Sequence, residues 1–162
     1  IRLAEPGQVS SLPGYAAGDW WVQDAAAALA APLLAVKPGE KVLDMCAAPG
    51  GKTLQLAAAG AQVTALDLSA PRMEKLRENL TRTRLQAKLV VTDALHWQPE
   101  QLFDAVLLDA PCSATGTIRR HPELPHIRDG AGLAELTELQ AQLIDLGLQL
   151  RDLTVVRARV GR

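Results

Sequence analysis

The sequence predicts an α/β fold with a doubly wound, mainly parallel sheet. Short apolar runs alternate with helical patterns, as in KVLD, then LQLAAAG, then AQVTALD. Each apolar run ends in or just before an aspartate, at the edge where open parallel sheets bind ligands. A loop of small residues, CAAPGG, follows the first run and opens directly into a helix. These observations together predict a ligand site at the carboxyl edge of the sheet.

Length and composition limit the possible classes of protein. The chain has 162 residues, enough for one domain with a substantial core. Hydrophobic residues make up 48% and charged residues 22%, which is typical of a globular chain. No apolar run approaches the roughly 18 residues that cross a bilayer, so we expect no membrane association. The two cysteines show no disulfide spacing, which favours a reduced, cytoplasmic protein. A net charge of −1 and 3% aromatic residues confine any nucleic-acid contact to a local patch.

The elements can be assigned in order along the chain. Residues 1–19, rich in Gly, Pro and Ser, predict an extended lead-in, and the alanine-rich residues 25–36 predict a helix that Pro32 kinks or ends. We therefore divide the chain into a lead-in with its helix, residues 1–36, and a core, residues 37–162. In the core, strands are expected at residues 41–44, 61–66, 88–91, 103–108 and 153–156, and helices at 54–59, 69–84 and 133–150, with a loop at 115–132.

The aspartates at the strand ends form the predicted centre of the site. Asp67 follows the first strand-end aspartate, Asp44, by about twenty residues, a spacing that suits hydrogen bonds to ribose hydroxyls. Asp93 follows the third strand and could meet an adenine edge. Asp109 follows the fourth strand and would face the group that reacts. Any one of these aspartates could simply cap a loop, but the ordered set favours a ligand site.

A phosphate-binding P-loop is the rival interpretation. Gly51, Lys52 and Thr53 match the end of that motif, and residues 106–109 resemble its metal-holding strand. However, the P-loop requires a glycine where this chain has Cys46, and Pro49 has no N–H to offer a phosphate. A P-loop nucleotide-binding protein therefore remains the less favoured alternative.

Longer segments carry a resemblance to a known family. VLDMCAAPGGKT, ALDLSAPRMEKLRENLTR, VVTDA and FDAVLLDAPCSATGTIRRHPEL resemble the Fmu/Sun (NSUN-type) family of RNA cytosine-5 methyltransferases, in particular the bacterial enzymes acting on small-subunit ribosomal RNA. The upstream WVQDAAAALAAPLL is similar to the segment before the cofactor loop of that family. A glycine loop alone would be weak support, whereas DMCAAPGGKT together with DAPCSATG is specific. The resemblance implies a Rossmann-like class I methyltransferase fold.

The resemblance also implies S-adenosylmethionine as cofactor and ribosomal RNA as substrate. The loop at residues 46–52 would wrap the methionine part, Asp67 would hold the ribose, and Asp93 would lie near the adenine. Asp109 would lie near both the methyl donor and the target base. The implied cofactor-binding residues are Cys46, Ala47, Ala48, Pro49, Gly50, Gly51, Lys52, Asp67, Asp93 and Asp109.

The basic run after the second motif suggests contact with RNA. Arg119, Arg120 and His121 could meet phosphates beside a flipped-out base, although a solvated loop is the plainer interpretation. His96 and His126 show no metal-ligand spacing with the cysteines, so we expect no metal site.

Methylation at C5 of cytosine requires a cysteine thiolate that adds to C6 and so activates C5. In the family that the chain resembles, the Pro-Cys cysteine, here Cys112, is associated with product release, and the attacking cysteine belongs to a Thr-Cys motif after the fifth strand. Asp109 beside the base would stabilise the activated ring. Two alternatives for Cys112 are the nucleophile, as in DNA cytosine-5 methyltransferases, and a small buried loop residue.

The end of the chain departs from the family pattern. A Lys-Pro-Gly-Gly-like turn, an apolar strand and Thr-Cys-Ser are expected, but the chain reads LGLQLRDLTVVRARVGR and has no third cysteine. We therefore expect a methyltransferase sheet that is incomplete at its C-terminal end and a chain that does not turn over. The alternative function is a truncated module that binds the cofactor without catalysis.

Overall fold

A parallel sheet forms the centre of the computed structural model, which describes residues 7–118, 121–123, 126 and 130–151. Within these residues the sheet has four strands in the order β3-β2-β1-β4. The strands are β1 (Lys41–Met45), β2 (Gln62–Asp67), β3 (Lys88–Val91) and β4 (Ala105–Leu108). All three pairings are parallel. The predicted α/β class and parallel sheet are confirmed.

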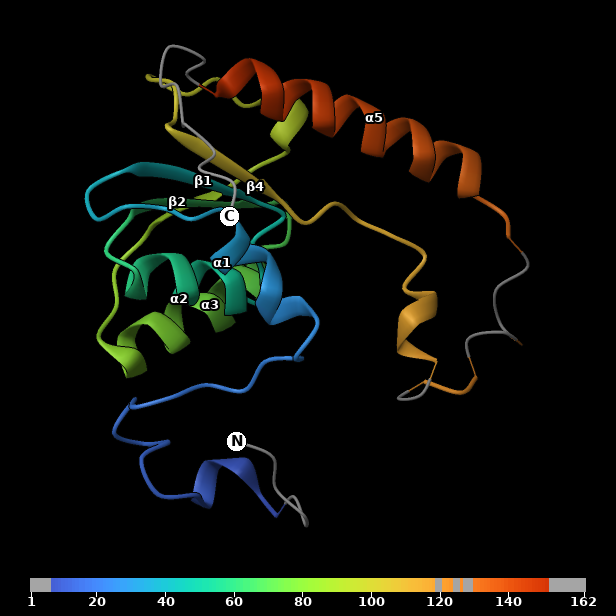
Figure 1. Ribbon diagram of the computed structural model, residues 1–162. Coiled ribbons are helices and arrows are strands. Elements are labelled where there is room, and N and C mark those ends of the chain that lie inside the picture. Colours follow the sequence, from blue (N-terminus) through green and yellow to red (C-terminus); the bar gives the residue numbers. More distant parts are fainter. Residues whose placement is uncertain (1–6, 119–120, 124–125, 127–129, 152–162) are drawn as a thin grey trace, which may run out of the picture.

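Helices cover both faces of the sheet (Figure 1). The helices α1 (Ala30–Leu33), α2 (Gly51–Ala58) and α3 (Ala70–Thr83) lie on one face, and α5 (Leu133–Leu150) lies on the other. Val42 packs against the α1 and α2 side, whereas Leu43 and Met45 pack against the α5 side. Because successive side chains of a strand point to opposite faces, a strand covered on both faces must be apolar almost throughout. That requirement explains why β1 reads as a continuous apolar run.

Two helices differ from their predicted bounds by more than one residue at an end. Helix α2 begins at Gly51, earlier than residue 54, because Gly50 caps it with a φ of 108° and lets the helix start at once. The helix expected over residues 25–36 is a 3₁₀ turn, η2 (Ala27–Leu29), continued by the short α1. Pro32 lies in the last turn of α1, which agrees with the prediction that it could end the helix. Helix α5 has its predicted bounds, and its leucine spacing places Leu143 and Leu150 in the core.

The lead-in folds back instead of running extended. After the 3₁₀ turn η1 (Val9–Ser11), consecutive turns bring Tyr15 beneath the guanidinium of Arg82, which lies 4.0 Å from the ring centroid. Arg82 also donates hydrogen bonds to the carbonyls of Tyr15 and Trp20, at 2.7 and 3.0 Å. A Cβ at Gly18 would collide with the carbonyl of Arg82, so the lead-in lies directly on the end of α3. These contacts are tertiary, which is why local composition did not predict them.

Arg151, directly after α5, pairs with the segment just before β4. Phe103 and Arg151 form a parallel bridge, and the Phe103 N–H donates to the carbonyl of Leu150 at 3.0 Å. Strand β4 itself begins at Ala105, and Phe103 belongs only to the bridge. The fifth strand predicted at residues 153–156 lies outside the described residues. No helix in the described part of the chain combines the length and the apolar character that crossing a membrane requires.

Candidate functional site

The strand order reverses between β1 and β4, and the loops that leave these two strands frame a cavity of about 230 Å³. Open parallel sheets bind ligands at such a reversal, outside the carboxyl ends of the strands. The cavity is lined by Asp44 of β1, by Asp109 after β4, by the loop Cys46, Ala47, Ala48, Pro49, Gly50, Gly51 and Lys52, and by Val22, Gln23, Asp24 and Ala27. The structure therefore brings the whole predicted cofactor loop and Asp109 together.

A larger hollow of about 800 Å³ lies at the other end of the sheet, around the first residues of β1, β2 and β3. Its lining, taken from the described residues, includes no carboxylate, cysteine or histidine. Such a surface lacks the carboxylate and thiol groups that line the smaller cavity, so the smaller cavity is the better candidate for catalysis.

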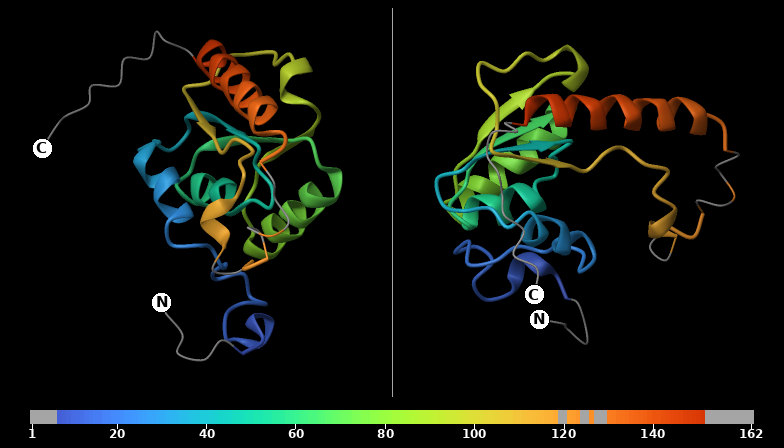
Figure 2. Two further views of the ribbon diagram at one scale, coloured as in Figure 1. Left: turned by 90° about the vertical axis from the view of Figure 1, so that its right-hand side faces the viewer. Right: turned by 45° about the horizontal axis from the view of Figure 1, so that its top comes forward.

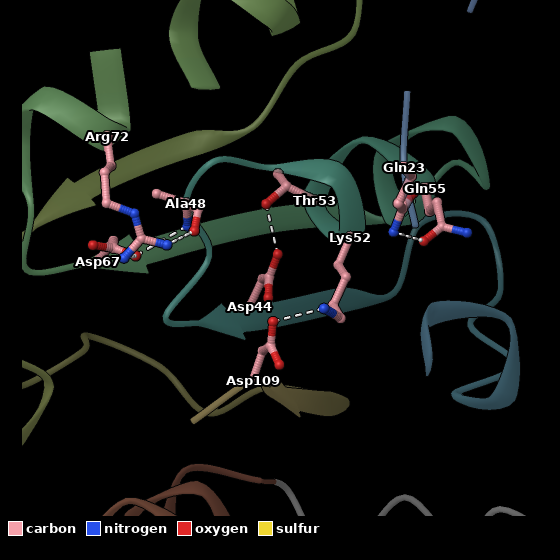
Figure 3. A network of polar contacts seen from close by, with 9 residues as sticks. All are labelled: Gln23, Asp44, Ala48, Lys52, Thr53, Gln55, Asp67, Arg72 and Asp109. Carbon is pink, nitrogen blue, oxygen red and sulfur yellow. Dashed lines mark hydrogen bonds and ion pairs between the residues drawn. The ribbon is translucent and has the colours of Figure 1, made fainter. Parts of the chain in front are cut away.

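Asp44 is the most unusual group in the cavity. Its side chain is fully buried, and its Oδ2 accepts a 2.6 Å hydrogen bond from the hydroxyl of Thr53 (Figure 3). Its Oδ1 has no hydrogen-bond partner among the described residues. Burial raises the pKa of Asp44 to about 7, against the opposing effects of the Thr53 hydrogen bond and the charge of Lys52. A buried carboxyl with a free acceptor atom and a pKa near neutrality is typical of a functional site.

Lys52 and Asp109 form an ion pair across the reversal point. Lys52 Nζ lies 2.6 Å from Asp109 Oδ2, so the first turn of α2 is tied to the end of β4 (Figure 3). The Lys52 side chain is only 15% exposed, whereas that of Asp109 is 56% exposed. The pair therefore holds Asp109 in place while leaving its carboxylate open to solvent. A carboxylate fixed in this way can face an incoming substrate.

Asp67 lies behind the loop and does not line the cavity. It is buried, and its two oxygens accept hydrogen bonds from the N–H groups of Ala48 and Ser69, at 3.0 and 2.9 Å. Arg72 comes within 3.8 Å of the same carboxylate and donates to the carbonyl of Ala48 (Figure 3). Asp67 thus joins the cofactor loop to the start of α3, and its ribose contact stays a prediction.

Asp93 also lies outside the cavity. Its Oδ1 accepts from the N–H of Leu95 at 3.0 Å and caps the 3₁₀ turn η3 (Ala94–His96). Its Oδ2 lies 3.0 Å from His96 Nδ1. The hydrogen bond from Leu95, followed by that from His96, lowers the pKa of Asp93. The carboxylate is ionised and 45% exposed, and its role beside an adenine stays a prediction.

The two cysteines differ in chemistry. Burial raises the pKa of Cys46 to about 11, and the nearby carboxylates of Asp67 and Asp109 raise it further, so this thiol stays protonated and unreactive. Cys112 is exposed, which excludes the interpretation of a small buried loop residue. Gln140 of α5 donates a 2.6 Å hydrogen bond to the carbonyl of Pro111 and so anchors the loop that carries Cys112.

The predicted RNA contacts are only partly visible. Arg119 and Arg120 lie outside the described residues. His121 is exposed, and its Nδ1 lies 3.3 Å from Glu123 Oε1, so its role with RNA stays a prediction. In the described ranges no three His, Cys, Asp or Glu side chains gather as a metal ion would require.

Four lining residues were missed as site residues by sequence reasoning. They precede the core and are Val22, Gln23, Asp24 and Ala27. Asp24 also accepts a hydrogen bond from the N–H of Ala26 at 2.9 Å. The available signal was a Gln-Asp pair one residue after two tryptophans, at the point where the Gly- and Pro-rich composition ends.

Comparisons with known proteins agree with this geometry. Residues 31–153 match the family model described as 16S rRNA methyltransferase RsmB/F. The chain is 50% identical over 151 residues to ribosomal RNA small subunit methyltransferase B of Pseudomonas syringae pv. tomato, covering 90% of this chain and 34% of that protein. It is 48% identical over 151 residues to the protein of the same name from Vibrio vulnificus, covering 90% and 35%. The chain thus spans about a third of the length of the curated relatives that it matches.

Solved structures show the same likeness. NSun6 from Pyrococcus horikoshii with SFG has a TM-score of 0.81 and 29% identity, covering 91% of this chain and 39% of that one. A methyltransferase homolog protein from the same organism has a TM-score of 0.78 and 33% identity, covering 91% and 48%. A SAM-dependent methyltransferase from Thiobacillus denitrificans, 19% identical with a TM-score of 0.53 over 77% of this chain and 43% of that one, shares the fold alone.

Proposed function

The chain belongs to the RsmB/F family of 16S rRNA methyltransferases and has the Rossmann-like fold of that class, and on this premise we propose that the cavity beside Asp44 and Asp109 binds S-adenosylmethionine. The domain then serves methyl transfer to C5 of a cytosine in small-subunit ribosomal RNA. The observation that carries the proposal is the convergence of the cofactor loop, the buried Asp44 and the exposed Asp109 on one cavity at the strand reversal.

The residues around the cavity fit the cofactor chemically. The methionine end of S-adenosylmethionine carries an ammonium, a sulfonium and a carboxylate group, one positive charge in all, and the described lining holds the carboxyl groups of Asp24, Asp44 and Asp109 against the single cation of Lys52. The free Oδ1 of Asp44 can accept a hydrogen bond from an ammonium group. A volume of about 230 Å³ suits one end of the molecule, since pockets that enclose drug-sized ligands take about 300–1,000 Å³. We therefore assign the ribose to Asp67 and the adenine to Asp93, outside the cavity.

The chain's own residues supply part of the chemistry. When bound, the cofactor supplies an electrophilic methyl group. Asp109, held by Lys52, would bind the N3 side of the cytosine and stabilise the activated ring. Cys112 would assist release of the product, because its exposed thiol lies in the anchored loop that follows Asp109. Cys46 takes no part as a nucleophile, because its thiol stays protonated.

A cofactor-binding module without turnover is the second candidate function. The chain has two cysteines, one of which is unreactive and the other assigned to product release. The attacking thiolate is then missing, so transfer of labelled methyl groups from S-adenosylmethionine to 16S rRNA should stay at background with this chain. Labelled S-adenosylmethionine mixed with the RNA and no protein is the control for background. Robust turnover would contradict this assignment and would make Cys112 the nucleophile.

Cofactor binding itself can be measured by calorimetry. The chain should bind S-adenosylmethionine, and Asp67→Ala should weaken binding at least tenfold. The reason is that Asp67 holds the N–H groups of Ala48 and Ser69 in addition to its proposed ribose contact. Asp145→Ala, at an exposed position of α5, is the matched control and should leave the affinity unchanged. A chain that is folded by circular dichroism but shows no binding would refute the proposal.

A further inference from the structure

A relay of side-chain amides links the lead-in to the cofactor loop. The indole Nε1 of Trp21 donates to Gln23 Oε1 at 3.2 Å. Gln23 Nε2 donates in turn to Gln55 Oε1 at 2.9 Å, as Figure 3 shows. Gln55 Nε2 in turn donates to the carbonyl of Ala28 at 2.9 Å. The relay therefore joins three separate segments: the lead-in, helix α2 and the 3₁₀ turn η2.

Gln23 is the member of the relay that touches the cofactor loop. A Cβ added at Gly51 would lie 3.0 Å from Gln23 Cδ and 3.3 Å from its Nε2, so the amide packs directly on the backbone where α2 begins. Gln23 also lines the cavity, whereas Trp21 and Gln55 are not among the residues that line it. The first N–H groups of α2 have no partner within the helix, so the position of this backbone decides where they point. A side chain that packs against Gly51 can fix that position.

The relay has one orientation. The indole N–H of Trp21 can only donate, so Gln23 turns its oxygen to Trp21 and its amino group to Gln55. The carbonyl of Ala28 can only accept, so Gln55 turns its amino group there and its oxygen to Gln23. Trp21 is half-buried against the core cluster beneath α3, which fixes the far end of the relay. Each amide is thereby held at both ends.

We infer that Gln23 is a positioning residue for the cofactor site: through Gly51 it holds the turn from the loop into α2 in the shape that the methionine end of the cofactor requires. This inference rests on the proposed function, because it assigns a role in the same cavity. It also assigns the lead-in a role in shaping the cofactor site, since Trp21 and Gln23 connect that segment to the cofactor loop.

Two isosteric substitutions separate this role from a merely structural one. Gln23→Glu sets an oxygen against Gln55 Oε1 and breaks the relay at the residue that touches Gly51. Gln55→Glu makes the same chemical change one step further away, where it retains an acceptor for Gln23 and disturbs only the contact with Ala28. We expect calorimetry to show at least tenfold weaker S-adenosylmethionine binding for Gln23→Glu and less than a threefold change for Gln55→Glu. Gln55→Glu adds the same negative charge one step further along the relay, so it serves as the control for the effect of charge on cofactor binding.

Amide hydrogen exchange without the cofactor provides the second measurement. Exchange at residues 50–53 should quicken in Gln23→Glu and remain as in the parent chain in Gln55→Glu. If the parent chain fails to bind the cofactor, the proposed function fails, but the exchange rates still decide whether Gln23 holds the turn. Unchanged affinity and exchange in Gln23→Glu would overturn the inference. Equal losses of affinity and melting temperature in both variants would also overturn it, because they would indicate that the relay contributes only to the stability of the fold.

Discussion

Replacing Asp44 with asparagine is expected to stabilise the folded chain above neutral pH. Burial raises the pKa of Asp44 from 3.8 to about 7, so the folded state keeps a proton that the unfolded chain has released. The free energy of unfolding therefore falls as the pH rises from about 4 to about 7, and the loss is complete above pH 7. A shift of this size corresponds to about 4 kcal/mol. Asparagine is neutral at every pH and keeps an oxygen for the Thr53 hydroxyl, so it avoids this penalty.

Urea denaturation at two pH values measures the effect. Relative to the parent chain, Asp44→Asn should gain about 1–2 kcal/mol at pH 5 and about 4 kcal/mol at pH 8, following the proton linkage. Asp145→Asn, on the exposed side of α5, should show no comparable dependence on pH. An equal gain at both pH values would show that the benefit of asparagine does not come from the charge of Asp44.

The same substitution should weaken cofactor binding at least tenfold. Oδ1 of Asp44 is an acceptor without a partner among the described residues, and an asparagine would place either a neutral oxygen or an N–H group there. Greater stability combined with poorer binding would identify Asp44 as a residue retained for function at the expense of stability. Unchanged affinity would show that the buried carboxyl does not serve the cofactor.

The core of the fold could be predicted from the sequence because its signals are local. Strand β1 is covered on both faces and reads as a nearly continuous apolar run, whereas α5 repeats leucine at the helical period, so the local sequence pattern located both. The lead-in could not be predicted in this way. Its turns depend on Arg82, a residue of α3 far along the chain, which stacks on Tyr15 and binds its carbonyl. No local pattern encodes such a contact.

The candidate site shows a similar division. The positions of Asp67 and Asp109 at strand ends followed from strand spacing, and the structure places both at the carboxyl edge of the sheet. The contacts that these two aspartates make could not be predicted from the sequence. Asp67 is engaged by two backbone N–H groups, and Asp109 is held by Lys52, because the loop and the strand ends meet only after folding. Gln23 was missed as a site residue for the same reason.

Replacing Gly50 with alanine should disrupt both stability and binding. Gly50 has a φ of 108°, in the region that residues with a Cβ rarely adopt, and a Cβ there would collide with the side chain of Leu76 in α3. Backbone strain of about 1–2 kcal/mol and overpacking of about 1–3 kcal/mol together predict a loss of about 3 kcal/mol in the free energy of unfolding. The loop would have to move away from α3, so the affinity for S-adenosylmethionine should fall more than tenfold.

A control substitution at a second glycine distinguishes the cost of backbone strain from the cost of the side-chain collision. Gly39 has a φ of 85°, and no atom of the described residues lies within 4 Å of the Cβ that Gly39→Ala would add. Gly39→Ala should therefore cost only the backbone strain, about 1–2 kcal/mol, and leave the affinity unchanged. Gly50→Ala combined with Leu76→Ala should cost less than the sum of the two single changes, because the smaller side chain removes the collision. If Gly50→Ala and Gly39→Ala cost the same and bind equally well, close packing of the loop on α3 does not shape the site.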